Sequence, residues 1–450
     1  MASWVRPPRG CTMASPGSRR VRILFVAEAV TLAHVLRPLA LARMLDPAHF
    51  EVHFACDPRC WSLLGEGPGR RWPLATMVPQ TFLDRLRAGA TLYRLDELER
   101  YVAADRELLR QTEPAVVVGD FRLSLGIAAP LHGVHYMNVT NAHWSPYRGQ
   151  WSFPLPEHVL GRILGQHLGQ RVFDAVRPAV FAWHARPVNR LRRRHGLPAL
   201  GNLLSVYTQG DTVLYSDIPE LAPTYAAPGT HHYLGPLGAQ PTQTLPTWAD
   251  QIPDDASAVY VNLGSSGRAD LLPELLGGLA QHPGAVLAAT AGRIDLPPRA
   301  GHIRVEKYLP GDWAAAHSAV VVCNGGSAPV YQALRQGTPV VGIASNLDQF
   351  LMMQAVERAG AGLLLRSGPC RGAAVAQAVE RVRSDPRYRQ AAQALARSIT
   401  RFDPATRFNE ILQNVLSGRA APSETRGARA GPTERPSVTG GGYLLEANRA

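Results

Sequence analysis

The stretch that decides the fold is residues 308–349, YLPGDWAAAHSAVVVCNGGSAPVYQALRQGTPVVGIASNLDQ. It predicts two buried strands, 319–323 and 339–343, because each is a continuous apolar run of the kind found in parallel sheets. Between them a glycine turn leads into an amphipathic helix, with Pro329 expected as its first residue and Gly337 at its end. A helix N-terminus beside a glycine turn presents free N–H groups and a positive dipole, so this turn is a site for a phosphate or diphosphate.

The order and spacing of residues in this stretch resemble the donor-binding box of family 1 glycosyltransferases, which have the GT-B fold. An aromatic-x-Pro comes first, at Tyr308, and a His follows nine residues later, at His317. Asn324 stands where the family has the His of a His-x-Gly turn, and the acid–Gln pair Asp348 and Gln349 begins 24 residues further on. Such agreement is more specific than a glycine motif alone. The resemblance implies an α/β protein with two Rossmann-like domains that face an interdomain cleft.

The resemblance also implies a donor-binding set. Tyr308 would stack on the nucleotide base, Leu309 would offer main-chain contacts, and Asp348 and Gln349 would bond the sugar hydroxyls. For His317, a core or capping role is the alternative. The further donor-binding candidates are Ser265, Ser266, His317, Asn324, Gly325, Gly326, Ser327 and Gln332.

Four positions of the box depart from the family pattern, and one of them is Gly311, which stands where the family has a Gln after the aromatic-x-Pro. Asn324 replaces the phosphate-contacting His, Pro329 replaces a Ser or Thr donor, and Gln332 replaces the ribose-binding Glu. These changes keep the scaffold but weaken the stabilisation of a diphosphate, part of which the helix dipole and Ser327 could supply. An alternative to an active enzyme is therefore a catalytically silent homologue that binds a nucleotide sugar, or a partner of an active transferase.

A second constellation lies near the N-terminus. Residues 21–27 predict a first buried strand, and His34 follows in the next turn, while a later strand, 115–119, runs into Asp120. Open α/β sheets bind ligands at the carboxyl ends of such strands. The resemblance implies that His34 is the general base for the acceptor hydroxyl, worth about 10²–10⁴ in rate, and that Asp120 orients it. A helix-start His and a turn-capping Asp are the structural alternatives.

Acceptor-binding candidates follow a predicted strand at 134–138. They are Asn141, His143 and Trp144, whose amide and aromatic groups could form an acceptor wall; His143 is also a second candidate for the base. A core position is the alternative for Trp144. A helix is predicted over 178–198, where the arginines at 192–194 are expected to form a solvated face, with contact to anionic lipid head groups as the weaker alternative.

The length of 450 residues suits two domains rather than one core. The expected organisation is a disordered extension (1–20), an acceptor-binding Rossmann-like domain (21–237), a linker (238–256), a nucleotide-sugar-binding Rossmann-like domain (257–400), a closing helix (401–417) and a disordered tail (418–450). Five irregularly spaced cysteines suggest neither a disulfide framework nor a zinc site and favour a cytoplasmic location.

Composition and missing motifs exclude several classes of function. The net charge of +12 is scattered along the chain, unlike the concentrated basic surface of a nucleic-acid-binding protein. No apolar run approaches the ~18–20 residues of a membrane span. The first strand lacks the G-x-G-x-x-G of dinucleotide sites, and no D-x-D occurs, which argues against a metal-dependent transferase.

The sequence therefore predicts an inverting, metal-independent glycosyltransferase. It would move a sugar from a UDP- or dTDP-sugar to a hydroxyl of a small-molecule or lipid acceptor, with no cofactor beyond this co-substrate. Peripheral membrane contact is compatible with such an acceptor. A GT-B enzyme with other chemistry, such as a nucleotide-sugar 2-epimerase, is a weaker fit, because the pairing of His34 with Asp120 suits transfer better.

Overall fold

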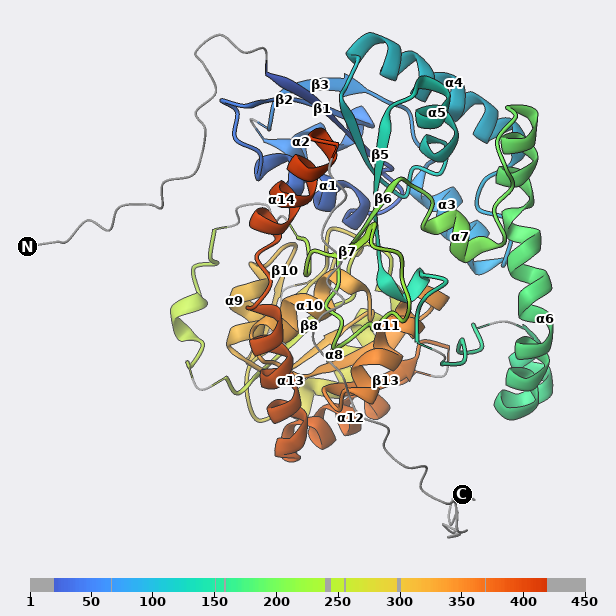
Figure 1. Ribbon diagram of the computed structural model, residues 1–450. Helices are drawn as coiled ribbons and strands as arrows, with labels where there is room; N and C mark the ends of the chain where they lie inside the picture. The colour runs from blue at the N-terminus through green and yellow to red at the C-terminus, as the bar shows by residue number, and fades with distance from the viewer. Residues whose placement is uncertain are drawn as a thin grey trace, which may run out of the picture.

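A computed structural model shows two parallel sheets, each flanked by helices, joined into one molecule (Figure 1). The structure describes residues 20–418 apart from 66, 150, 158, 239–243, 255, 298–300 and 369. The two segments expected to be disordered, 1–20 and 418–450, fall almost wholly outside the described residues, as does part of the expected linker.

The first domain contains a seven-stranded sheet with the order β3-β2-β1-β4-β5-β6-β7. Its strands are β1 (Val21–Ala27), β2 (Phe50–Cys56), β3 (Arg70–Pro73), β4 (Val116–Asp120), β5 (His135–Thr140), β6 (Thr212–Tyr215) and β7 (His231–Tyr233). All neighbouring strands pair in parallel. The order reverses between β1 and β4, so the loops after these two strands diverge and leave a crevice at their carboxyl ends.

The helices of this domain cover both faces of the sheet and one side of the molecule. They are α1 (Ala33–Arg43), α2 (Trp61–Leu64), α3 (Pro79–Arg87), α4 (Leu95–Thr112), α5 (Leu125–His132), α6 (Val159–Arg194) and α7 (Leu203–Tyr207). The helix predicted over 178–198 is thus the end of a longer element, and it stops at Arg194, four residues before the predicted end. Gly165, whose backbone is left-handed, kinks α6 near its start. Figure 1 shows α6 along the outer right side of the molecule, beside both domains.

The second domain repeats this design with six strands in the order β10-β9-β8-β11-β12-β13, again with a reversal, here between β8 and β11. The strands are β8 (Ala258–Asn262), β9 (Val286–Ala289), β10 (Ile303–Glu306), β11 (Ser318–Cys323), β12 (Val340–Ala344) and β13 (Gly362–Arg366). The helices are α8 (Leu272–Gly278), α9 (Gly311–Ala316), α10 (Ser327–Arg335), α11 (Leu347–Arg358), α12 (Gly372–Ser384) and α13 (Pro386–Ile399). The predicted architecture of two Rossmann-like domains is confirmed.

Helix α10 begins at Ser327, two residues before the predicted start at Pro329. Proline is tolerated there because the N–H groups of a helix's first turn have no intrahelical acceptor. The turn and helix therefore still place free N–H groups at the carboxyl end of β11.

The last helix, α14 (Pro404–Leu416), returns to the first domain. Its Phe408 is fully buried, with its ring 6.3 Å from that of Phe25 in β1, and Ile411 and Leu412 join the same core. Figure 1 shows α14 in red beside α1, beyond α13 of the second domain. In the part of the chain that the structure describes, no helix is long and apolar enough to cross a membrane.

Candidate active site

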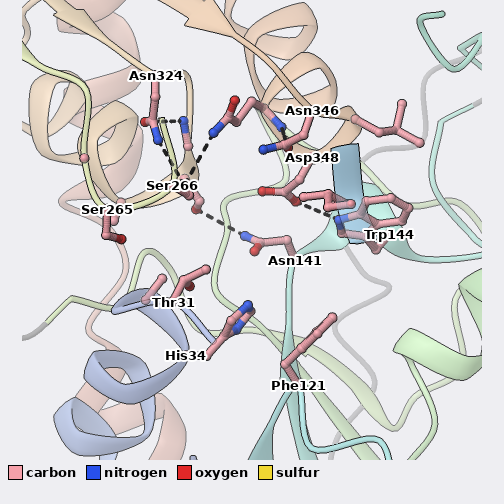
Figure 2. Close-up of a pocket in the computed structure, with 18 of the residues that line it drawn as sticks. Thr31, His34, Phe121, Asn141, Trp144, Ser265, Ser266, Asn324, Asn346 and Asp348 are labelled. Carbon is pink, nitrogen blue, oxygen red and sulfur yellow. Dashed lines mark hydrogen bonds between the residues drawn. The ribbon is translucent and has the colours of Figure 1, made fainter. Parts of the chain in front are cut away.

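A cavity of about 1380 Å³ lies between the two domains. Loops at the reversal points of both sheets line this cavity. In the first domain His34 lies after β1 and Asp120 is the last residue of β4. In the second domain Ser265 lies after β8 and Asn324 after β11. Figure 2 shows His34 and Phe121 facing Ser265, Ser266 and Asn324 across this space, with Asn141 between them. The placement follows from topology, because carboxyl-end loops beside a reversal point diverge and leave room for a ligand.

His34 and Asp120 are in direct contact, as the sequence predicts. His34 Nδ1 lies 2.7 Å from Asp120 Oδ1, and the carboxylate is fully buried. A hydrogen bond from Nδ1 leaves Nε2 as the basic nitrogen. Phe121 stacks on the imidazole, with ring centroids 4.7 Å apart and planes 17° from parallel. The arrangement orients a base at the wall of the cavity.

Arg37 is a third member of this group, and the sequence reasoning missed it. Its Nε and Nη2 donate to the two oxygens of Asp120 at 2.7 and 2.8 Å, and its Nη1 donates to Asn141 Oδ1 at 2.7 Å. Burial acts to raise the pKa of Asp120, but the charges of Arg37 and His34 outweigh it and lower that pKa. Arg37 follows His34 by three residues on the same helix, and this spacing could have indicated that the two side chains are neighbours.

The loop that carries Asp120 is anchored by buried charges. Arg122 donates from Nη1 to Glu28 Oε2 at 2.8 Å and from Nε to Asp105 Oδ1 at 3.0 Å, and all three side chains are fully buried. Between these anchors, Phe121 has a φ of 57°, a left-handed conformation that is costly for a residue with a β-carbon. The anchoring thus holds the Phe121 ring against His34.

On the other side of the cavity, Ser266 is held by two amides. Asn324 Nδ2 donates to Ser266 Oγ at 3.1 Å, and Gln349 Nε2 donates to it at 3.4 Å. Two incoming hydrogen bonds occupy both lone pairs of a hydroxyl, so the Ser266 O–H must point to another acceptor. Asn324 Oδ1 also accepts from the N–H of Gly326 at 3.1 Å, which fixes the turn. Asn324, the residue at the family's His position, therefore braces the loops that follow β8 and β11.

Gln349 has a structural role that the sequence did not predict. Its Oε1 accepts from the Ser345 N–H at 2.8 Å and from Ser345 Oγ at 2.9 Å, and its side chain is buried although it reaches the cavity wall. Its amide oxygen is thus engaged within the protein, and the predicted bond of Gln349 to a sugar hydroxyl stays a prediction for its amide nitrogen.

Asp348 lies in the cavity with its side chain 44% exposed and is held by the first domain. Its Oδ1 accepts from Trp144 Nε1 at 2.7 Å and from His143 Nε2 at 2.9 Å. Burial acts to raise the pKa of Asp348, but the hydrogen bonds from His143 and Trp144 outweigh it and lower the pKa to about 2. Oδ2 is left for a ligand hydroxyl.

Two predicted donor residues do not line the cavity. His317 sits just before β11, at the edge of the sheet opposite Asn324, and its ring bonds the Trp313 carbonyl at 2.8 Å and Asp254 at 2.9 Å. Its donor-binding assignment is wrong, and the capping alternative holds. Gly325 makes the left-handed turn, φ 74°, but faces Met353 and not the cavity.

One predicted acceptor residue is also misplaced. His143 does not line the cavity and is committed to Asp348, so neither acceptor contact nor the role of second base fits it. The other predicted residues, whose roles stay predictions, do line the cavity: Ser265, Tyr308, Leu309, Gly326, Ser327, Gln332, Asn141 and Trp144.

Asn141 connects the two domains. Its Nδ2 lies 3.2 Å from Ser327 Oγ at the start of α10 and 3.1 Å from Asp217 Oδ2. Asp217 also accepts from Tyr331 Oη of the second domain at 2.9 Å. Asp217 and Tyr331 were missed, although Asp217 follows strand β6 at the same sheet edge. A continuous chain of hydrogen bonds therefore runs from Asp120 through Arg37 and Asn141 to the donor-side helix.

Beyond His34 the cavity continues as an apolar arm. Its walls come from α3, α6 and α7 of the first domain. They are formed by Phe82, Leu83, Leu86, Phe173, Val180, Phe181, Leu203, Val206 and Tyr207. Among the described residues, no group of three or more His, Cys, Asp or Glu side chains is placed to hold a metal ion.

Comparison with known proteins identifies relatives over most of the chain. Residues 279–414 match the family model described as Erythromycin biosynthesis protein CIII-like, C-terminal domain. The chain is 50% identical over 406 residues to the PGL/p-HBAD biosynthesis rhamnosyltransferase of Mycobacterium tuberculosis (strain ATCC 25177 / H37Ra), covering 90% of each chain.

Two further matches are a relative named inactive and a solved structure. The Inactive PGL/p-HBAD biosynthesis glycosyltransferase of Mycobacterium bovis (strain BCG / Pasteur 1173P2) is 46% identical over 267 residues, 59% of this chain and 73% of the relative. The crystal structure of the glycotransferase of kitacinnamycin superposes with a TM-score of 0.67 at 18% identity, over 89% of this chain and 100% of that one. The sequence relatives establish the family, and the solved structure establishes the fold: the chain belongs to the family 1 glycosyltransferases of GT-B fold.

Proposed function

We propose that this enzyme transfers a 6-deoxyhexose, rhamnose in the first instance, from a dTDP- or UDP-sugar to a hydroxyl of an apolar acceptor, with inversion. The observation that carries the proposal is the contact between His34 and Asp120, placed where the polar and apolar arms of one cavity meet. The rhamnosyl group follows the named activity of the relative with 50% identity.

The chemistry follows from the positions of the groups. His34 Nε2 takes the proton of the acceptor hydroxyl, whose oxygen attacks the anomeric carbon as the bond to the nucleoside diphosphate breaks. Asp120 stabilises the imidazolium that forms, and the proton then passes to solvent. A single displacement, with the base on the side opposite the leaving group, inverts the anomeric centre.

The leaving diphosphate needs charge stabilisation that a metal ion supplies in other transferases. The available groups are the Ser266 hydroxyl, whose hydrogen is directed away from Asn324 and Gln349, and the N-terminus of α10. Preorganised donors of this kind stabilise developing negative charge without reorganisation. We therefore expect transfer to continue in the presence of EDTA.

The acceptor class is inferred from the apolar arm. Aromatic and aliphatic side chains of α3, α6 and α7 surround it, and Phe121 closes its inner end beside His34. An acceptor with an aromatic ring or alkyl chain next to its hydroxyl would remove this surface from water, at roughly 25 cal/mol per Å².

The test is to incubate the enzyme with dTDP-rhamnose or UDP-rhamnose and a series of alkylphenols, and to follow nucleoside diphosphate release together with glycoside formation by mass spectrometry. An inverted glycoside, formed with EDTA present and absent with His34→Ala, supports the proposal. A retained anomer contradicts the mechanism. If the protein binds the donor but transfers its sugar to none of the acceptors, the result would instead support the alternative of a catalytically silent homologue. One relative is itself named inactive.

A further inference from the structure

Helix α6 has a solvent-facing apolar stripe. Leu168, Val176 and Trp183 are 52%, 42% and 42% exposed, although large apolar side chains are usually covered. Their spacing places them on one face of the helix, along with the exposed Ala175 and Ala179. Apolar side chains that share one exposed helix face and are rimmed by charged residues mark an interaction surface.

The same face becomes basic toward the end of the helix. Arg186, Arg190 and Arg193 continue the stripe at intervals of three and four residues, and all three are exposed. Within the described part of the chain none of them forms an ion pair. From residue 164 onward α6 has a single acid, Asp174, which pairs with Arg177 at 3.5 Å. The face is thus apolar, then cationic, and among the described residues no acid pairs with these three arginines.

The stripe meets the mouth of the apolar arm. Val176 and Trp183 are exposed and also line the cavity, whereas Phe173, Val180 and Phe181 on the same helix face its interior. In Figure 1 the helix stands along the outer right side of the molecule. If this face of α6 were bound to a surface, an apolar molecule leaving that surface could enter the cavity without crossing bulk water.

We propose that the outer face of α6 binds the surface of an anionic lipid bilayer, with Leu168, Val176 and Trp183 in the head-group region and Arg186, Arg190 and Arg193 at lipid phosphates. A helix with an apolar stripe and a basic flank lies in the plane of such an interface. Arginine close to an anionic surface contributes about fivefold to binding per side chain. The proposal needs neither donor binding nor turnover.

The experiment is flotation of the full chain with phosphatidylcholine vesicles and with mixed phosphatidylcholine–phosphatidylglycerol vesicles, at low and high salt. We expect binding to the anionic vesicles that weakens with salt. Arg186→Glu/Arg190→Glu/Arg193→Glu should lower the partition coefficient by at least about 100-fold. Leu168→Ser/Trp183→Ser should lower it by about tenfold through the lost apolar contact.

The matched control is Arg381→Glu/Arg397→Glu/Arg401→Glu, which makes the same charge change on exposed positions of the second domain. It should bind vesicles like the unchanged protein. Thermal melts of every variant check that the fold is intact, since all six arginines are exposed. Failure of the unchanged protein to float with anionic vesicles overturns the proposal, and so does equal loss in the control and α6 variants. Glycosyl transfer in solution without vesicle binding would leave the proposed function standing and remove this inference alone.

Discussion

The two sides of the cavity differ in how their polar groups are used. On the first-domain side, Asp120 receives bonds from His34 and Arg37, which leaves the imidazole Nε2 as the nitrogen that we propose acts on the acceptor. On the donor side, Asn324 occupies the family's His position and turns inward to Ser266 and Gly326. The first side has the His–Asp contact that the sequence predicts, whereas the second has a braced hydroxyl beside the position where the family pattern has a phosphate-contacting His.

This difference shows that a donor-binding motif can keep a structural role at a position where its phosphate-contacting residue has been replaced. An amide is a weaker phosphate ligand than an imidazolium, but it can satisfy both of its polar atoms within the protein. We propose that the Ser266 hydroxyl, which Asn324 positions, replaces part of the lost phosphate contact. Activity therefore depends on whether Ser266 and the α10 N-terminus suffice for the leaving group, and single variants on each side can separate these contributions.

The largest effect should come from His34→Ala. Removing the base leaves a hydroxyl of high pKa to attack unaided, so kcat/KM should fall by about 10²–10⁴. Initial rates of glycoside formation measure this loss. The stability should change little, because the buried Asp120 carboxylate retains its bonds from Arg37. A decrease below threefold would remove His34 from the mechanism.

Asp348→Asn tests the sugar side of the comparison. The carboxylate accepts from Trp144 and His143, and replacing it loses charge-assisted bonds worth about 1.5–3 kcal/mol. We expect the donor KM to rise by about 10–100-fold.

The pH dependence of this effect has a defined sign. The pKa of Asp348 lies at about 2, below the ordinary value, so its contribution is complete above the ordinary value and is lost only as the pH falls toward 2. The ratio of donor KM values between variant and wild type should therefore stay constant from pH 5 to pH 8, and a ratio that collapses within this range would contradict the assignment.

Asn324→Ala addresses the brace itself. Without the bond to Ser266 Oγ, the hydroxyl is free to rotate and the turn loses its contact with the Gly326 N–H. We expect about a tenfold loss in kcat/KM, comparable to one neutral hydrogen bond. Asn324→His is the informative partner variant: if direct phosphate contact is the better solution, it should exceed Asn324→Ala in rate. Equal rates for all three proteins would show that position 324 does not act on the donor.

Arg37→Gln should have the smallest effect at neutral pH, a few-fold loss, but a distinct pH profile. Arg37 holds down the pKa of Asp120 against burial, so removing its charge raises that pKa. Because Asp120 must be ionised, activity should then begin to fall at a higher pH on the acid side than in wild type. Arg37→Lys, which keeps the charge, is the control. Superimposable acid limbs for Arg37→Gln and wild type would contradict this role.

The sequence pattern predicted the positions of those site residues that depend only on the order of the strands. Apolar runs marked β1, β4, β8 and β11, and residues directly after such strands share one sheet edge. His34, Asp120 and Ser266 could therefore be placed around one cavity without coordinates. The same logic shows why His317 failed: it precedes β11, so it lies at the opposite edge despite the expected spacing.

The hydrogen-bond partners of individual side chains could not be predicted from the sequence pattern. The inward bonds of Gln349 and the reach of Trp144 to Asp348, from one domain to the other, depend on packing between distant segments. Arg192 illustrates the limit: it was expected on a solvated face, yet it is buried and donates to the Gly126 carbonyl at 2.6 Å. A run of three arginines does not reveal which one points inward.

We infer that donor binding and base catalysis reside on opposite sides of one cavity. Calorimetric titration of dTDP-rhamnose and UDP-rhamnose separates the two. One donor should bind wild type and His34→Ala with the same micromolar Kd, about −8 kcal/mol, while Asp348→Asn binds it at least tenfold more weakly and His34→Ala forms no glycoside. Loss of donor binding in His34→Ala, or no binding of either nucleotide sugar to wild type, would contradict the account.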